Sequence, residues 1–108
     1  MDALQKMKTE NKFDENGVPS GGTVRGIGLT VTWQEGPLGR PEARKEQNGA
    51  LVEDLLQVCL DRLKLFQDTR FNCPENVLAA SSIEEALKWL QKRTEDREKR
   101  LVDGTFEV

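Results

Sequence analysis

The sequence predicts an α+β fold in which a small β element near the N-terminus is followed by a long antiparallel hairpin of two helices. Residues Thr23 to Trp33 are rich in β-branched side chains, and small residues alternate with bulky ones, which is typical of a strand with one buried face. Two long segments with helical apolar spacing follow. Only the six residues DTRFNC separate them, and helices joined by so short a connection pack antiparallel.

The predicted strand contains one candidate binding residue, Arg25. It lies on the face that carries the bulky side chains of Ile27, Leu29, Val31 and Trp33. A buried arginine requires an anionic partner, and a phosphate group would be one. Gly26 and Gly28 on the other face indicate the close approach of another backbone.

The first predicted helix begins near Asn48, a favourable N-cap residue, and ends near Gln67. Pro74 suits the first turn of the second helix, which is predicted to end near Arg100. The first helix carries an apolar stripe wide enough to face more than one neighbour. The stripe consists of Val52, Leu55, Leu56, Cys59, Leu63 and Phe66, widened by Leu51, Val58, Leu60 and Leu65.

A chain of 108 residues is expected to form a single domain. So short a chain buries a modest share of its surface, and oligomerisation is a natural source of additional core. The predicted segments are a flexible arm at residues 1–12, the β element at 13–35, a loop at 36–47, the helical hairpin at 48–100 and a tail at 101–108.

Composition argues against several classes of protein. The net charge is −3, so no basic face for duplex nucleic acid is expected. No apolar run approaches the length of a membrane span, and MDALQKMKTE lacks the apolar region of a signal peptide, so we expect a cytosolic protein. The chain has no histidine, and the spacing of Cys59 and Cys73 suits neither a metal site nor a disulfide framework. We therefore predict no catalytic residue, no bound metal and no cofactor.

Four residues around the two helices form a set suited to holding a nucleotide. The Phe66 ring can stack on a base, and the Asn76 amide can form hydrogen bonds with the polar edge of a base. The guanidinium groups of Arg93 and Arg97 match phosphate oxygens. Each also has a purely structural interpretation: Phe66 as core, Asn76 as a capping residue, and the arginines as a solvated helix end.

Helix geometry separates two members of this set. Asn76 and Arg93 are seventeen positions apart, which is about 25 Å at 1.5 Å per residue. A nucleotide-sized ligand spans about half of that, so one pocket that uses both residues requires a second chain. We therefore predict a homodimer, or a larger assembly built from it, with the ligand at the interface.

Several short motifs occur in an order that resembles a known family. They are WQEGPLG, RLKLFQ, FNCPEN, EEALKWLQKRTEDRE and a closing GT, within residues 30–105. The chain resembles the phage Thoeris anti-defence sponge proteins of the first-described type. The helical hairpin is also similar to that of the anti-CBASS cyclic-nucleotide sponges.

The resemblance implies that the β element is antiparallel and that the protein is not an enzyme. It implies capture of the small-molecule signal glycocyclic ADP-ribose, without cleavage, in the cytoplasm of the infected bacterial host. Phe66, Asn76 and Arg93 correspond to ligand-binding residues of the family, with Arg97 one turn on and Arg25 as the match for a strand arginine. The family's tail often ends in GTH, whereas this chain reads Gly104-Thr105-Phe106.

Two alternatives stay open at this level. The main ligand could instead be a cyclic di- or trinucleotide, as in the anti-CBASS sponges. The chain could also be a helical oligomerisation or regulatory module that holds no small ligand.

Overall fold

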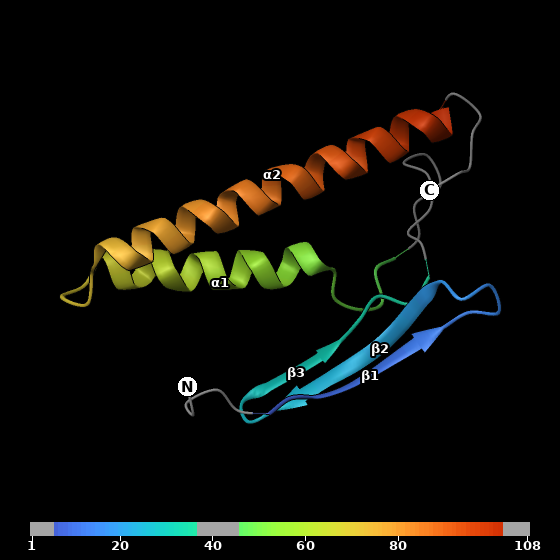
Figure 1. Cartoon of the computed structure of the whole chain (residues 1–108), viewed down its shortest axis with the longest axis horizontal. Coiled ribbons are helices and arrows are strands. Elements are labelled where there is room, and N and C mark those ends of the chain that lie inside the picture. The colour runs from blue at the N-terminus through green and yellow to red at the C-terminus, as the bar shows by residue number, and fades with distance from the viewer. Residues whose placement is uncertain (1–5, 37–45, 103–108) are drawn as a thin grey trace. The chain divides into compact units, whose positions relative to one another are not determined.

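The computed structural model describes residues 6–36 and 46–102, which fall into two compact units, the first ending at Leu51 and the second beginning at Val52 (Figure 1). The first unit is a three-stranded antiparallel sheet, and the second is a pair of helices, which confirms the predicted α+β class. The predicted loop at 36–47 and tail at 101–108 lie largely outside the described residues.

The sheet begins earlier in the chain than predicted. Strand β1, Lys8–Phe13, pairs with β2, Pro19–Gly26, where the sequence predicted a flexible arm up to residue 12. All six side chains of β1 are exposed, so no apolar alternation marks the strand. Asp14 closes the turn between the strands, because its Oδ1 accepts the backbone N–H groups of Asn16 and Val18 at 2.8 and 3.0 Å.

The predicted strand from Thr23 to Trp33 is a hairpin. Strand β2 ends at Gly26, and β3, Leu29–Thr32, returns antiparallel beside it, with Gly26 paired to Leu29. Ile27 and Gly28 form the turn, with Ile27 87% exposed and Gly28 at a φ of 75° that favours glycine. Gly28 thus serves a turn and not a close approach; that role belongs to Gly22, where the β1 backbone would block a side chain.

The hairpin turn moves Arg25 to the other face of the sheet. Residues paired directly across an antiparallel ladder share a face. Val24 pairs with the buried Val31, whereas Arg25 pairs with Thr30, and both Arg25 and Thr30 are exposed. The prediction that Arg25 belongs to a buried face is therefore wrong, because it assumed unbroken alternation through the turn.

The segment before the helices is tied to the end of the sheet. Ala50 forms a parallel bridge with Trp33. The Asn48 side chain accepts the N–H of Glu35 at 2.8 Å and donates to the Glu35 carbonyl at 3.1 Å. The predicted N-cap role of Asn48 is therefore wrong, and the first helix begins four positions later, at Val52.

The second unit is the antiparallel hairpin of helices α1, Val52–Gln67, and α2, Pro74–Val102, which confirms the predicted arrangement (Figure 1). Leu60 and Ala80 are buried between the helices. Val58 and Leu65 of the predicted stripe stay 67% and 50% exposed, so α2 covers only part of the apolar surface of α1. In the described part of the chain, neither helix carries an apolar stretch long enough to cross a bilayer.

Candidate ligand-binding site

The helical hairpin divides the predicted binding residues between its two ends. Phe66 lies in the last turn of α1 and Asn76 in the first turn of α2, so both lie at the closed end, where the helices are joined. Arg93 lies far along α2, where it forms an ion pair with Glu53 in the first turn of α1. The structure thus brings Phe66 and Asn76 to one end of the hairpin and Arg93 and Arg97 toward the other.

At the closed end, both predicted residues are partly exposed. The guanidinium carbon of Arg62 lies 5.4 Å from the centroid of the Phe66 ring, within the range of a cation–π contact. The Asn76 amide donates to the Phe71 carbonyl at 3.5 Å, at the outer limit for a hydrogen bond. A bond that long leaves most of the hydrogen-bonding capacity of the Asn76 side chain available to a ligand.

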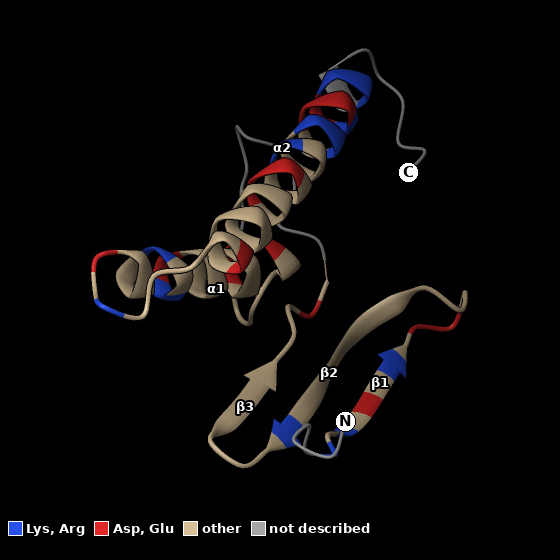
Figure 2. Ribbon diagram, turned by 60° about the vertical axis from the view of Figure 1, so that its left-hand side comes forward, with Lys and Arg blue, Asp and Glu red and all other residues tan. Residues whose placement is uncertain are grey.

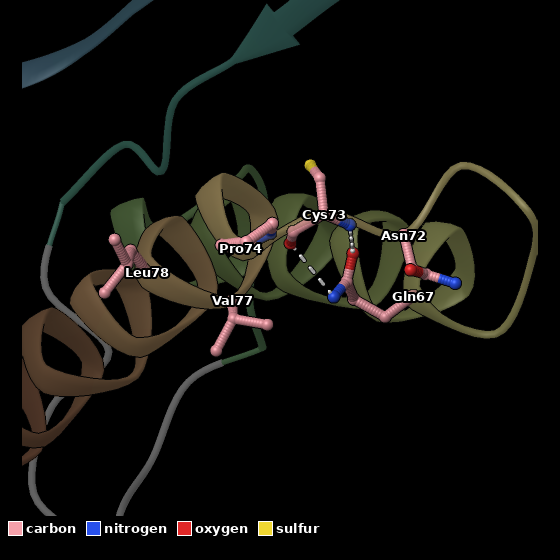
Figure 3. Close-up of a pocket in the computed structure, with 6 residues that line it drawn as sticks. All are labelled: Gln67, Asn72, Cys73, Pro74, Val77 and Leu78. Atoms are coloured by element: carbon pink, nitrogen blue, oxygen red, sulfur yellow. Dashed lines mark hydrogen bonds between the residues drawn. The ribbon is translucent and has the colours of Figure 1, made fainter.

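An open depression of about 590 Å³ adjoins the turn between the helices (Figure 3). Gln67 holds the turn closed: its amide nitrogen donates to the Cys73 carbonyl at 3.2 Å, and its amide oxygen accepts the Cys73 N–H at 3.1 Å. Phe66 and Asn76 are not among the lining residues, although Gln67 and Val77 directly follow them in sequence. The depression is lined by Gln67, Asn72, Cys73, Pro74, Val77 and Leu78.

Sequence reasoning missed Gln67, although one signal for it was present. An amide that follows the last apolar residue of a helix can bind both backbone groups of a residue across a short loop. The residue just before Pro74 is the natural partner, because it opens the second helix. Gln67 therefore sets the geometry of the closed end.

We expect Gln67→Ala to destabilise the protein by about 1–3 kcal/mol, because it removes two hydrogen bonds from a partly buried turn. Urea unfolding followed by circular dichroism measures this change. Gln57→Ala is the matched control, because the amide of Gln57 bonds only the exposed Asp61 one turn along the same helix. Equal destabilisation by both substitutions would contradict the role assigned to Gln67.

At the other end, the two arginines differ in their surroundings. Arg93 Nη2 lies 3.6 Å from Glu53 Oε1, and the side chains are 43% and 30% exposed. Arg97 is exposed one turn farther on, and its side chain has no ion pair or hydrogen bond with any residue that the structure describes. In Figure 2, ribbon segments of Lys and Arg (blue) alternate with segments of Asp and Glu (red) along this part of α2. Lys92 Nζ lies 3.1 Å from Asp96 Oδ2, so these neighbouring opposite charges form an ion pair.

Arg25 belongs to the sheet unit and is described only within it. It stands in register with Lys8 of β1, so the two cations are neighbours on the polar, exposed face. Among the described residues Arg25 has no ion pair or hydrogen bond through its side chain. Its part in ligand binding stays a prediction.

The chemistry at the two ends is that of recognition. The closed end offers an aromatic ring and an amide, and the other end offers two guanidinium groups. Cys59 and Cys73 are free thiols in this chain, and no cluster of three potential metal ligands occurs within residues 6–36 and 46–102. The aromatic ring can stack on a base, the amide can donate hydrogen bonds, and the guanidinium groups can pair with phosphates.

Comparison with known proteins agrees with this hairpin architecture. Residues 27–95 match the family model described as Acb2/Tad1, hairpin domain, which is more than half of the chain. The chain therefore belongs to the Acb2/Tad1 hairpin family, which confirms the resemblance seen in the sequence. The matched range includes Phe66, Asn76 and Arg93, whereas Arg25 and Arg97 lie just outside it.

A particular relative is Thoeris anti-defense 1 from Bacillus phage SBSphiJ7. It is 47% identical to this chain over 78 residues. The aligned part covers 72% of this chain and 52% of the relative. The chain thus spans about half the length of the curated relative that it matches.

Proposed function

We propose that this protein is a phage anti-defence sponge that binds glycocyclic ADP-ribose and holds it intact. By removing the signal from the cytoplasm of the infected cell, it would block Thoeris defence. Membership of the Acb2/Tad1 hairpin family and 47% identity to a protein named for opposing Thoeris support this proposal. The residue types at the two ends of the hairpin support a nucleotide-like ligand.

One structural observation carries the proposal: Asn76 and Arg93 lie too far apart on one helix for a single hairpin to bring both to one ligand. Asn76 and Arg93 lie on the same continuous helix, and their separation is about 25 Å. Two hairpins packed antiparallel place the closed end of each beside the arginines of the other. A two-fold axis between them creates two equivalent pockets in one homodimer.

The uncovered apolar surface of α1 supplies a contact for this dimer. Val58 and Leu65 are both exposed and are seven residues apart, so they lie on one face two turns from each other. Helices that associate along such a face bury apolar residues that a single hairpin leaves in water. Dimerisation would therefore contribute stability as well as complete the pocket.

In the proposed pocket, each residue has one role. Phe66 stacks on the adenine, and Asn76 bonds to the base or a ribose. Arg93 and Arg97 hold the pyrophosphate. A sponge removes one molecule per site, so it requires tight binding, and nanomolar affinity corresponds to about −12 kcal/mol. Charge-assisted hydrogen bonds and a stacked base are the interactions that can supply such affinity.

Titration calorimetry of the purified protein with glycocyclic ADP-ribose tests the proposal. We expect saturation at one ligand per chain with nanomolar affinity, and much weaker binding of linear ADP-ribose. A cyclic dinucleotide and a cyclic trinucleotide serve as competitors, because displacement by either would favour an oligonucleotide as the main ligand. Absence of heat with all four compounds would favour a helical module without a small ligand.

A further inference from the structure

We propose that Glu53 is a resident anion of the arginine site, which the phosphate of an incoming ligand must displace from Arg93. This inference rests on the proposed function, because it concerns the same site. Glu53 would limit the affinity of the arginine site for its ligand and restrict the site to strongly anionic ligands. The residue comes from α1, whereas the arginines come from α2.

The geometry of the Glu53–Arg93 pair is that of a contact that exchanges readily. One guanidinium nitrogen faces one carboxylate oxygen at 3.6 Å. Charge-assisted hydrogen bonds between such groups are about 2.7–2.9 Å long, and the strongest arginine pairs use two parallel bonds. Both side chains are partly exposed, so water can replace either partner. The ion pair therefore engages the Arg93 guanidinium without holding it in one position.

A ligand phosphate at Arg93 would meet two opposing influences. The first turn of α1 favours an anion, because its backbone N–H groups point toward the helix start. The Glu53 carboxylate already provides that negative charge, and a second anion beside it is repelled. Binding therefore requires that Glu53 leave Arg93, and the ligand must interact with the guanidinium more strongly than a single carboxylate does.

Arg97 differs from Arg93 in this respect. It lies one turn farther along α2 and has no competing carboxylate among the described residues. One phosphate can thus bind Arg97 directly, whereas the second must take Arg93 from Glu53. A pyrophosphate carries two charges and can satisfy both guanidiniums. A ligand with a single phosphate gains only the first contact, which is how Glu53 makes the site selective.

The test is the substitution Glu53→Gln, which keeps the shape of the side chain and removes its charge. Asp54→Asn is the matched control, because it removes the same charge from the same helix turn, about 100° away around the axis. We expect Glu53→Gln to bind glycocyclic ADP-ribose about two- to fivefold more tightly than the parent chain, the range spanned by exposed ion pairs. Asp54→Asn should change the dissociation constant by less than about twofold.

Calorimetry on parent and variants distinguishes the outcomes, with a thermal melt of each to establish that it is folded. Unchanged or weaker binding by Glu53→Gln, with a parent that binds, would overturn the role of Glu53 and leave the sponge proposal intact. An equal gain in Asp54→Asn would also overturn it, because general charge would then explain both. A parent chain that does not bind glycocyclic ADP-ribose would overturn the proposed function itself, and this inference with it.

Discussion

Replacing Asn76 with alanine is expected to remove most of the affinity for glycocyclic ADP-ribose and to leave the hairpin folded. In the free protein the Asn76 amide makes only a 3.5 Å bond to the Phe71 carbonyl, so its loss affects the turn little. In the complex, a ligand group that is buried without its partner costs about 1–3 kcal/mol, which is roughly five- to 150-fold in the dissociation constant. Calorimetry measures the affinity, and a circular-dichroism melt establishes the fold. If the variant binds like the parent and stays folded, the site at the closed end is wrong.

Phe66→Ala is the companion substitution at the same end. Loss of base stacking is expected to cost about 1–3 kcal/mol of binding. The ring is also half-buried under Arg62, so some loss of stability will accompany it. Phe71→Ala is a matched control, because Phe71 is exposed on the adjoining turn and has its own arginine, Arg70, 5.0 Å from the ring centroid. Loss of capture in Phe71→Ala alone would move the stacking role to that ring.

The second large effect is expected when two defective chains are combined. Asn76→Ala and Arg93→Ala homodimers should each bind the ligand far more weakly than the parent, because every pocket then lacks one residue. In a heterodimer of the two, one pocket lacks both residues and the other has both. We therefore expect co-purified heterodimers, isolated by two different affinity tags, to bind one ligand per two chains.

The same experiment tests whether the pocket is shared. The expected recovery depends on the position of both residues on α2, whose axial rise separates them by about 25 Å. Failure of the heterodimer to recover any binding would show that the two residues do not serve one pocket. Ligand binding by a protein that light scattering shows to be monomeric would show the same.

The helices were predictable from the sequence because their signals are local and repeated. Apolar spacing over several turns and Pro74 at the start of α2 are sufficient to place Val52–Gln67 and Pro74–Val102 to within a few residues. Strand β1 carries no such signal, since its six side chains are exposed and its order comes from backbone pairing with β2. Ile27 obscured the turn between β2 and β3, because an apolar residue in a two-residue turn continues the pattern of a strand.

For the candidate site, the sequence supplies the residue types on which the proposal depends but not their local contacts. The rise per residue of a helix predicts the distance between Asn76 and Arg93 along the axis. The structure places both residues on one continuous helix, in agreement with that distance. Glu53 and Asp54 are adjacent, and the structure pairs Arg93 with Glu53. The choice between the two carboxylates depends on how α1 is rotated about its axis against α2, and that rotation is set by tertiary packing. The bonds from Gln67 to Cys73 likewise depend on the path of the loop, which periodicity does not describe.

The most direct test of the sponge account is the identity and amount of the molecule that the protein retains. The purified protein is incubated with excess glycocyclic ADP-ribose, freed of unbound ligand and denatured by heat, and the released molecule is analysed by chromatography and mass spectrometry. We predict intact glycocyclic ADP-ribose at one molecule per chain, with no product accumulating during the incubation. Linear ADP-ribose or another product in more than stoichiometric amount, or no retained ligand at all, would contradict the account.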